Sequence, residues 1–274
     1  GTLTLNGSPV TVNQDITLAN LSSLSFTPAA NYNGAGSFQF QVNDGAASST
    51  TATLSLTITA VNDAPVLSGT GADMTAITED ATSNSGQLVS SVLASVSDVD
   101  SGAVQGVAIY ANNAGSSGGK WQYALTTNGT TWGSWTDVGT TSASSALLLK
   151  SNDKVRFLPD GKNAQTASFD YYAWDQSSGA AGGRADVSTR GTTTAYSTAS
   201  DTVSLSVTAV NDAPSGLGNP GLPPTYKNAT PAGTALNSLT GLSFQDVDSG
   251  ASLGGVVVVA NTANSSTEGS WQYS

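Results

Sequence analysis

The chain has 274 residues, a net charge of −11, and neither histidine nor cysteine. These absences exclude Ser-His-Asp triads, thiol catalysis, disulfides and metal sites built on histidine or cysteine. An acidic chain also lacks the basic surface that nucleic-acid binding needs, and no apolar run approaches the ~18–20 residues of a membrane span. We therefore expect no enzymatic activity, no nucleic-acid partner and no membrane insertion.

The acidic residues are almost all aspartate. Seventeen of the nineteen are Asp, and the two glutamates are Glu79 and Glu268. Aspartate favours turns, caps and hard-cation sites, whereas glutamate is more typical of helix surfaces. The composition therefore favours a helix-poor β protein that works outside the cell.

Strand patterns follow one another along the chain. Apolar and polar residues alternate over residues 37–42, 52–58, 168–171 and 203–207, which is the pattern of strands with one buried face. Residues 256–259 form a continuous apolar run, which predicts a central strand. Turn dipeptides such as Asn-Gly and Asp-Gly separate these runs, and no helical period extends over ten residues. The predicted fold is all-β, made of tandem antiparallel β-sandwiches.

Three phrases recur in the same order about 149 residues later, which indicates a repeat of domain size. They are Leu56–Pro65 repeated at Leu205–Pro214, Asp98–Ala103 repeated at Asp246–Ala251, and Trp121–Tyr123 repeated at Trp271–Tyr273. The spacing predicts the C-terminal part of one repeat over 1–63, a complete repeat over 64–212, and the N-terminal part of a third over 213–274.

The middle repeat is longer than the first. Phe26–Pro28 matches Phe157–Pro159 at an offset of 131, so the middle repeat holds about 18 extra residues before its final strand. They fall around residues 179–196, a Gly- and Thr-rich stretch that predicts a long loop or an extra hairpin.

The set of phrases resembles a known family. Val61–Pro65 at a strand end, then Thr78–Asp80 and Asp98–Asp100, together with Asn31–Gly34 before Ser37–Gly45, is similar to the tandem cadherin-like or Ig-like repeats of very large bacterial secreted adhesins. The resemblance implies extracellular, Ca²⁺-binding arms or surface filaments that serve cell adhesion and biofilm formation.

The resemblance also implies Ca²⁺ sites between successive repeats. At the first linker the implied ligands are Asn62, Asp63, Asp98, Asp100 and Asp175. At the second linker they are Asn211, Asp212, Asp246 and Asp248, joined by Glu79 and Asp160 from the preceding repeat. The turn that matches Asp160 reads Pro28-Ala29-Ala30 in the first repeat, so the first site lacks that acid.

Physical chemistry supports the same positions. Ca²⁺ takes 6–8 oxygen ligands, and alternate residues of an extended segment, such as Asp98 and Asp100, point to the same side. A cation that neutralises clustered carboxylates at a linker converts a flexible hinge into a stiff rod. The alternative is that both aspartate phrases are ordinary turns that bind no metal.

A second function from another class stays open: a sandwich that binds carbohydrate or protein. The five tryptophans are interpreted first as core residues, as the repeat of Trp121 at Trp271 favours, and the Trp132–Trp135 segment is the better candidate for a surface that stacks against sugars. Seven of the eight Lys and Arg residues lie between residues 120 and 190, a concentration that is more typical of a solvated face than of a site for anionic glycans. The other expected partners are neighbouring repeats, or copies of the chain arranged head-to-tail, unless the half-repeats belong to a longer polypeptide.

Overall fold

The computed structural model describes residues 1–274 except 117, 217, 231, 240, 263–265, 268, 269, 273 and 274, and the side chain of residue 237. Glu268 and Tyr273 therefore lie outside the described residues. The fold class is confirmed as all-β with several antiparallel sheets. The helical elements among the described residues are short 3₁₀ turns: η1 (Leu18–Ser23), η2 (Val89–Ser91) and η3 (Leu236–Ser238). None of the described residues belongs to a helix that is long and apolar enough to cross a bilayer.

The first segment, residues 1–63, forms two small sheets. Its strands are β1 (Thr2–Leu5), β2 (Ser8–Pro9), β3 (Leu24–Thr27), β4 (Gly34–Phe40) and β5 (Ala52–Ile58), paired in the order β2-β1-β3 and β4-β5. Asn6 and Gly7, both at positive φ, close the β1–β2 hairpin as the dipeptide predicts. No residue of this segment is buried.

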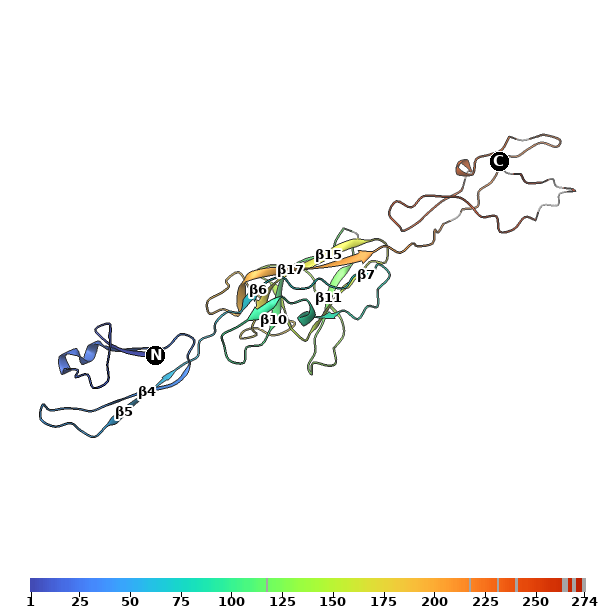
Figure 1. Ribbon diagram of the computed structural model, residues 1–274. Coiled ribbons are helices and arrows are strands. Elements are labelled where there is room, and N and C mark those ends of the chain that lie inside the picture. Colours follow the sequence, from blue (N-terminus) through green and yellow to red (C-terminus); the bar gives the residue numbers. More distant parts are fainter. Residues whose placement is uncertain are drawn as a thin grey trace.

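The middle segment, residues 64–212, contains two larger sheets and lies between the other two segments (Figure 1). The six-stranded sheet consists of β16 (Arg184–Ala185), β13 (Ala146–Lys150), β10 (Gly106–Asn113), β15 (Gln165–Trp174), β17 (Tyr196–Thr208) and β7 (Ile77–Thr78), in that order. The four-stranded sheet consists of β12 (Thr136–Asp137), β11 (Lys120–Ala124), β14 (Lys154–Leu158) and β8 (Gln87–Leu88). A further pair joins β6 (Val66–Ser68) to β9 (Ser95–Ser97). All these pairings are antiparallel except that of β7 with β17.

The main core lies between the two large sheets. Leu147 and Leu149 of β13 pack there with Trp121 and Phe157 of the four-stranded sheet. The ring of Trp121 meets those of Phe157 and Phe169 edge-on, at centroid distances of 5.2 and 5.0 Å. Trp121 is only 2% exposed, so its predicted core position is confirmed.

The opposite face of the six-stranded sheet is also buried. Leu148, between the two inward-facing leucines of β13, packs there with Trp174, Val187 and Tyr196. The insertion over residues 179–196 supplies two of these side chains and the short strand β16, so it covers the outer face of the sheet. A strand buried on both faces reads as a continuous apolar run, which is the pattern of β13.

The third segment contains few regular elements. Its described residues form the η3 turn and one isolated bridge between Ser215 and Gln245. The strand predicted over residues 256–259 is wrong, since no strand forms there and Val257 is 86% exposed. The matching run in the middle segment is held between β13 and β15, and the counterparts of those strands fall after residue 274 in the repeat alignment. Trp271 is likewise 66% exposed, contrary to the prediction of a core position.

Replacement of Leu148 by Ala tests the outer core. The side chain is fully buried beneath the insertion, so we expect the free energy of unfolding to fall by about 2–5 kcal/mol. Chemical denaturation followed by tryptophan fluorescence measures it, because four of the five tryptophans lie in the middle segment. Leu88→Ala, at a 36% exposed position, is the matched control and costs less than about 1 kcal/mol. Equal losses would contradict the outer core.

Candidate metal centre

Three acids meet where the middle segment joins the third. Glu79 follows β7, Asp212 lies in the linker after β17, and Asp248 belongs to the third segment. One carboxylate oxygen from each lies within 4.8 Å of the others. These acids are separated by up to 169 positions in the sequence, so tertiary contacts bring them together.

The parallel pairing of β7 with β17 positions Glu79. The strand register matches Thr78 with Thr208, and the amide of Glu79 then donates to the carbonyl of Thr208 at 3.0 Å. The amide of Val210, at the start of the linker, donates to Oε1 of Glu79 at 2.7 Å. The carboxylate is thus held by the linker itself.

The third segment contributes through an Asp-x-Asp turn. The amide of Asp248 donates to Oδ1 of Asp246, and the amide of Asp212 donates to Oδ2 of Asp248, both at 2.9 Å. The amide of Ser249 donates to Oδ1 of Asn163 in the middle segment, also at 2.9 Å. Linker and third segment are therefore tied by backbone donors to carboxylate and amide oxygens.

Two carboxylate oxygens of this cluster are buried and lack hydrogen-bond partners among the described residues. Glu79 is 0% exposed, yet its Oε2 makes no hydrogen bond, and the buried Oδ2 of Asp212 makes none either. Loss of hydration raises the pKa of the Asp212 carboxyl, and the negative charges of Asp80, Asp248 and Asp246 raise it further. Buried carboxylate oxygens without donors, in a group of like charges, are the donor set that a hard cation prefers.

The first joint, around Asn62 and Asp63, has the same local pattern. The amide of Asp63 donates to Oδ2 of Asp100 at 2.8 Å, and the amide of Asp100 donates to Oδ1 of Asp98 at 2.9 Å. Oδ2 of Asp98 is buried and makes no hydrogen bond. The Asn62 side chain donates to Oδ2 of the buried Asp175 at 2.9 Å. These bonds link Asn62 to Asp175, and Asp63 to Asp98 through Asp100, but the acids of this joint do not converge as those of the second joint do.

The two joints differ in the preceding segment. Among the described residues, a cluster of three acids is found only at the second joint, and the acids of the first joint form none. This agrees with the alanines that stand at positions 29 and 30, where the middle repeat has an acidic turn. At the second joint Asn211 is exposed and its side chain donates only to the carbonyl of Asp212.

Two expected acids, Asp246 and Asp160, are not among the three acids of this cluster. Asp246 accepts from the amide of Asp248, whereas Asp160 lies in a turn of the middle segment. Oδ1 of Asp160 accepts from the amide of Lys162 at 3.3 Å, as in an ordinary turn.

Two other residues take part at this joint that the sequence analysis missed: Asp80, which raises the pKa of Asp212, and Asn163. In the sequence, Asp80 could have been found because it follows Glu79 directly. Asn163 could have been found because it lies just after the turn that contains Asp160.

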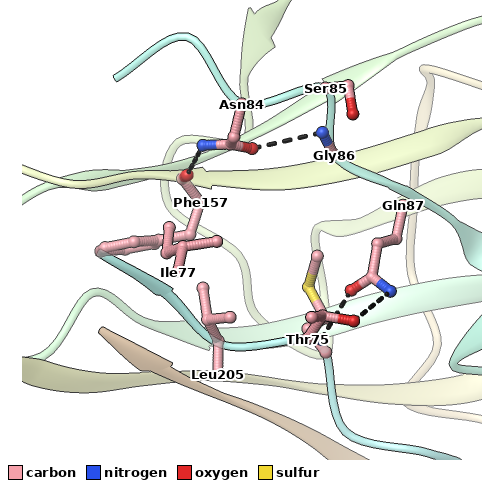
Figure 2. A pocket seen from close by; sticks show the side chains of 9 residues that line it. Thr75, Ile77, Asn84, Ser85, Gly86, Gln87, Phe157 and Leu205 are labelled. Carbon is pink, nitrogen blue, oxygen red and sulfur yellow. Dashed lines mark hydrogen bonds between the residues drawn. The ribbon is translucent and has the colours of Figure 1, made fainter. Parts of the chain in front are cut away.

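A separate slot opens on the side of the middle sandwich (Figure 2). Apolar side chains of Met74, Ile77 and Leu205 line it, and Gln87 closes one end with two hydrogen bonds to Thr75. No ionisable side chain is among its lining residues, so the slot offers no acid–base pair.

The first joint yields a test of the linker contacts. Asn62→Ala removes donors to Asp175, to the carbonyl of Thr194 and to that of Asp63. We expect the free energy of unfolding of the middle segment to fall by about 1–3 kcal/mol, because a buried acceptor loses its partner. Asn211→Ala, the equivalent change at the second joint, stays within about 0.5 kcal/mol. Equal effects in denaturant titrations would argue against this role of Asn62.

Comparison with known proteins agrees with the fold. Residues 2–59 match the family model described as "Cadherin-like domain". Neither the search of curated proteins nor that of solved structures found a match. The first segment is therefore similar to a cadherin-like repeat, a β-sandwich fold of structural and adhesive modules.

Proposed function

We propose that the chain is part of an extracellular arm that extends or adheres, and that Ca²⁺ stiffens its joints. In this proposal the arm belongs to a large bacterial surface adhesin or filament with a role in cell adhesion and biofilm formation. The fully buried and unpartnered Oε2 of Glu79, beside Asp212 and Asp248, is the observation that carries the proposal.

The residues of the second joint fit Ca²⁺. Glu79, Asp212, Asp246 and Asp248 offer carboxylate oxygens, with Asp80 nearby, and the ion accepts mixed carboxylate and carbonyl ligands. Bound Ca²⁺ supplies positive charge, which lowers the repulsion among these acids. Among the described residues the ion pair found is Lys120–Asp137, so no Lys or Arg neutralises this cluster.

The origin of the three acids explains why a cation would stiffen the joint. Glu79 belongs to the middle segment, Asp212 to the linker and Asp248 to the third segment. A metal bound to all three would link the middle and third segments through their connecting chain. Without it, like charges at the hinge favour separation of the same groups.

The first joint supports the same role with fewer acids. Asp63, Asp98 and Asp100 are already joined through backbone donors, and the unpartnered Oδ2 of Asp98 is available to a cation. No acid from residues 1–61 adds to this set, so we expect weaker Ca²⁺ binding here than at the second joint. Extracellular Ca²⁺ modules bind with Kd values of about 10⁻⁴–10⁻³ M, which suits an extracellular location.

Thermal unfolding with and without Ca²⁺ tests the proposal. A ligand that binds only the folded state at 100 times its Kd adds about 2.7 kcal/mol, or about 5–10 °C in Tm for a segment of this size. We expect this rise on addition of Ca²⁺ and its loss on chelation. Glu79→Gln keeps an acceptor for the amide of Val210 but removes the charge, so it should remove most of the rise.

Asp15→Asn is the control for that experiment. It removes one negative charge at an exposed position of the first segment, and the Ca²⁺-dependent rise in Tm should be unchanged. A chain whose Tm does not respond to Ca²⁺, or whose response survives in Glu79→Gln, would contradict a metal site at the second joint.

Small-angle scattering tests the stiffening separately. Ca²⁺ should narrow the distribution of end-to-end dimensions, because the second joint then holds one geometry. Asp248→Asn keeps an oxygen that accepts the amide of Asp212 but loses the charge, so its scattering with Ca²⁺ should resemble that of the chelated wild type. Identical wild-type curves with Ca²⁺ and with chelator would show that the metal, if bound, does not stiffen the arm.

A further inference from the structure

The middle segment carries a surface of paired aromatic and cationic side chains. Lys154 and Arg156 alternate on β14, so both point to the same outer face of the four-stranded sheet. Nζ of Lys154 lies 4.3 Å from the ring centroid of Trp132, and the guanidinium of Arg156 lies 4.2 Å from that of Trp135. We call these four residues the tryptophan face.

The first segment forms the matching hairpin and strand without these aromatic and cationic residues. In the first segment the hairpin between β1 and β2 closes with the two residues Asn6 and Gly7, whereas the matching hairpin between β11 and β12 has an eleven-residue loop over 125–135. Both tryptophans lie in that loop. The residues that match Lys154 and Arg156 in the first segment are Ser23 and Ser25. The middle segment therefore has both the two tryptophans and the two cations at positions where the first segment has neither.

The added loop is firmly held. Nε1 of Trp132 donates to the carbonyl of Asn152 at 2.9 Å, and the amide of Thr126 donates to Oδ1 of the buried Asp153 at 2.9 Å. Oδ1 of Asn128 accepts from the amides of two following threonines. A loop fixed in this way presents its half-buried indole rings without a large cost in conformational entropy on binding.

Among the described residues, neither cation has an acidic partner. Arg156 donates to Oε1 of Gln122 at 2.9 Å and to the carbonyl of Asn84 at 2.8 Å, both neutral groups. Nζ of Lys154 has one long contact, 3.4 Å, to the carbonyl of Ser85. In a chain of net charge −11, this face therefore presents unpaired positive charge.

We propose that the tryptophan face binds an acidic polysaccharide. Sugar carboxylates complement the charges of Lys154 and Arg156, and the apolar faces of the sugar rings complement the exposed parts of Trp132 and Trp135. The two cation–indole pairs are about 7 Å apart along β14, since their cations are two residues apart in one strand. Successive units of one polymer can therefore engage both pairs.

Calorimetric titration of the full chain, with Ca²⁺ present, tests this proposal. The acidic probe is a hyaluronan oligosaccharide, in which glucuronate alternates with N-acetylglucosamine, and the neutral probe is a chito-oligosaccharide of the same length. We expect binding of the hyaluronan oligosaccharide alone, with an affinity that falls as NaCl is raised, because exposed charges are screened.

Two variants locate the site. Trp132→Ala and Lys154→Gln should each weaken binding about ten-fold or more. Lys154→Gln leaves the loop and its rings in place, so it gives an answer even if loss of Trp132 disturbs folding. Lys162→Gln, which removes the same charge at an exposed position outside the tryptophan face, should bind as the wild type does.

Three results would overturn the proposal. They are no heat of binding with the acidic probe at millimolar concentration, equal binding of the two probes, and equal weakening by Lys162→Gln and Lys154→Gln. The last result would mean diffuse attraction by net local charge, without a site. None of these results bears on the Ca²⁺-dependent change in Tm, so the two proposals fail separately.

Discussion

A single hydrogen bond recurs at both joints and holds each linker to the segment that follows it. The amide of the linker aspartate, Asp63 or Asp212, donates to the second carboxylate of an Asp-x-Asp turn. Within each turn, the amide of the second aspartate donates to the carboxylate of the first. Because the acceptors are charged, these bonds place negative charge at the hinge of an acidic chain. The metal chemistry and the mechanics that we propose both depend on that placement.

The joints share this bond but differ in what surrounds it. At the second joint the parallel pairing of β7 with β17 holds Glu79 against the linker, which leaves a buried oxygen without a donor. At the first joint Asn62 instead binds the linker to Asp175. The same phrase can therefore form a joint rich in carboxylates or a joint held largely by amide contacts, according to the neighbouring strands.

Much of the fold could be predicted from the sequence because strands and turns are indicated by patterns of neighbouring residues. Alternation of apolar residues predicted strands such as β5, and the Asn-Gly dipeptide predicted the turn between β1 and β2. The strand predicted over residues 256–259 was wrong because an apolar run forms a strand only when partner strands lie beside it. The same limit applied to Trp271, whose match Trp121 is buried by strands that the described residues of the third segment do not form.

By itself the sequence determined the all-β class, the repeat of about 149 residues and the concentration of aspartates at the linkers. These follow from composition and spacing, which do not depend on the path of the chain. Only the tertiary structure decided that Glu79 lies beside Asp248 and that Asp160 is not part of this cluster. It also decided that Lys154 and Arg156 lie against the rings of Trp132 and Trp135. These contacts depend on strand register and on loops that bring distant residues together, so they leave no local pattern in the sequence.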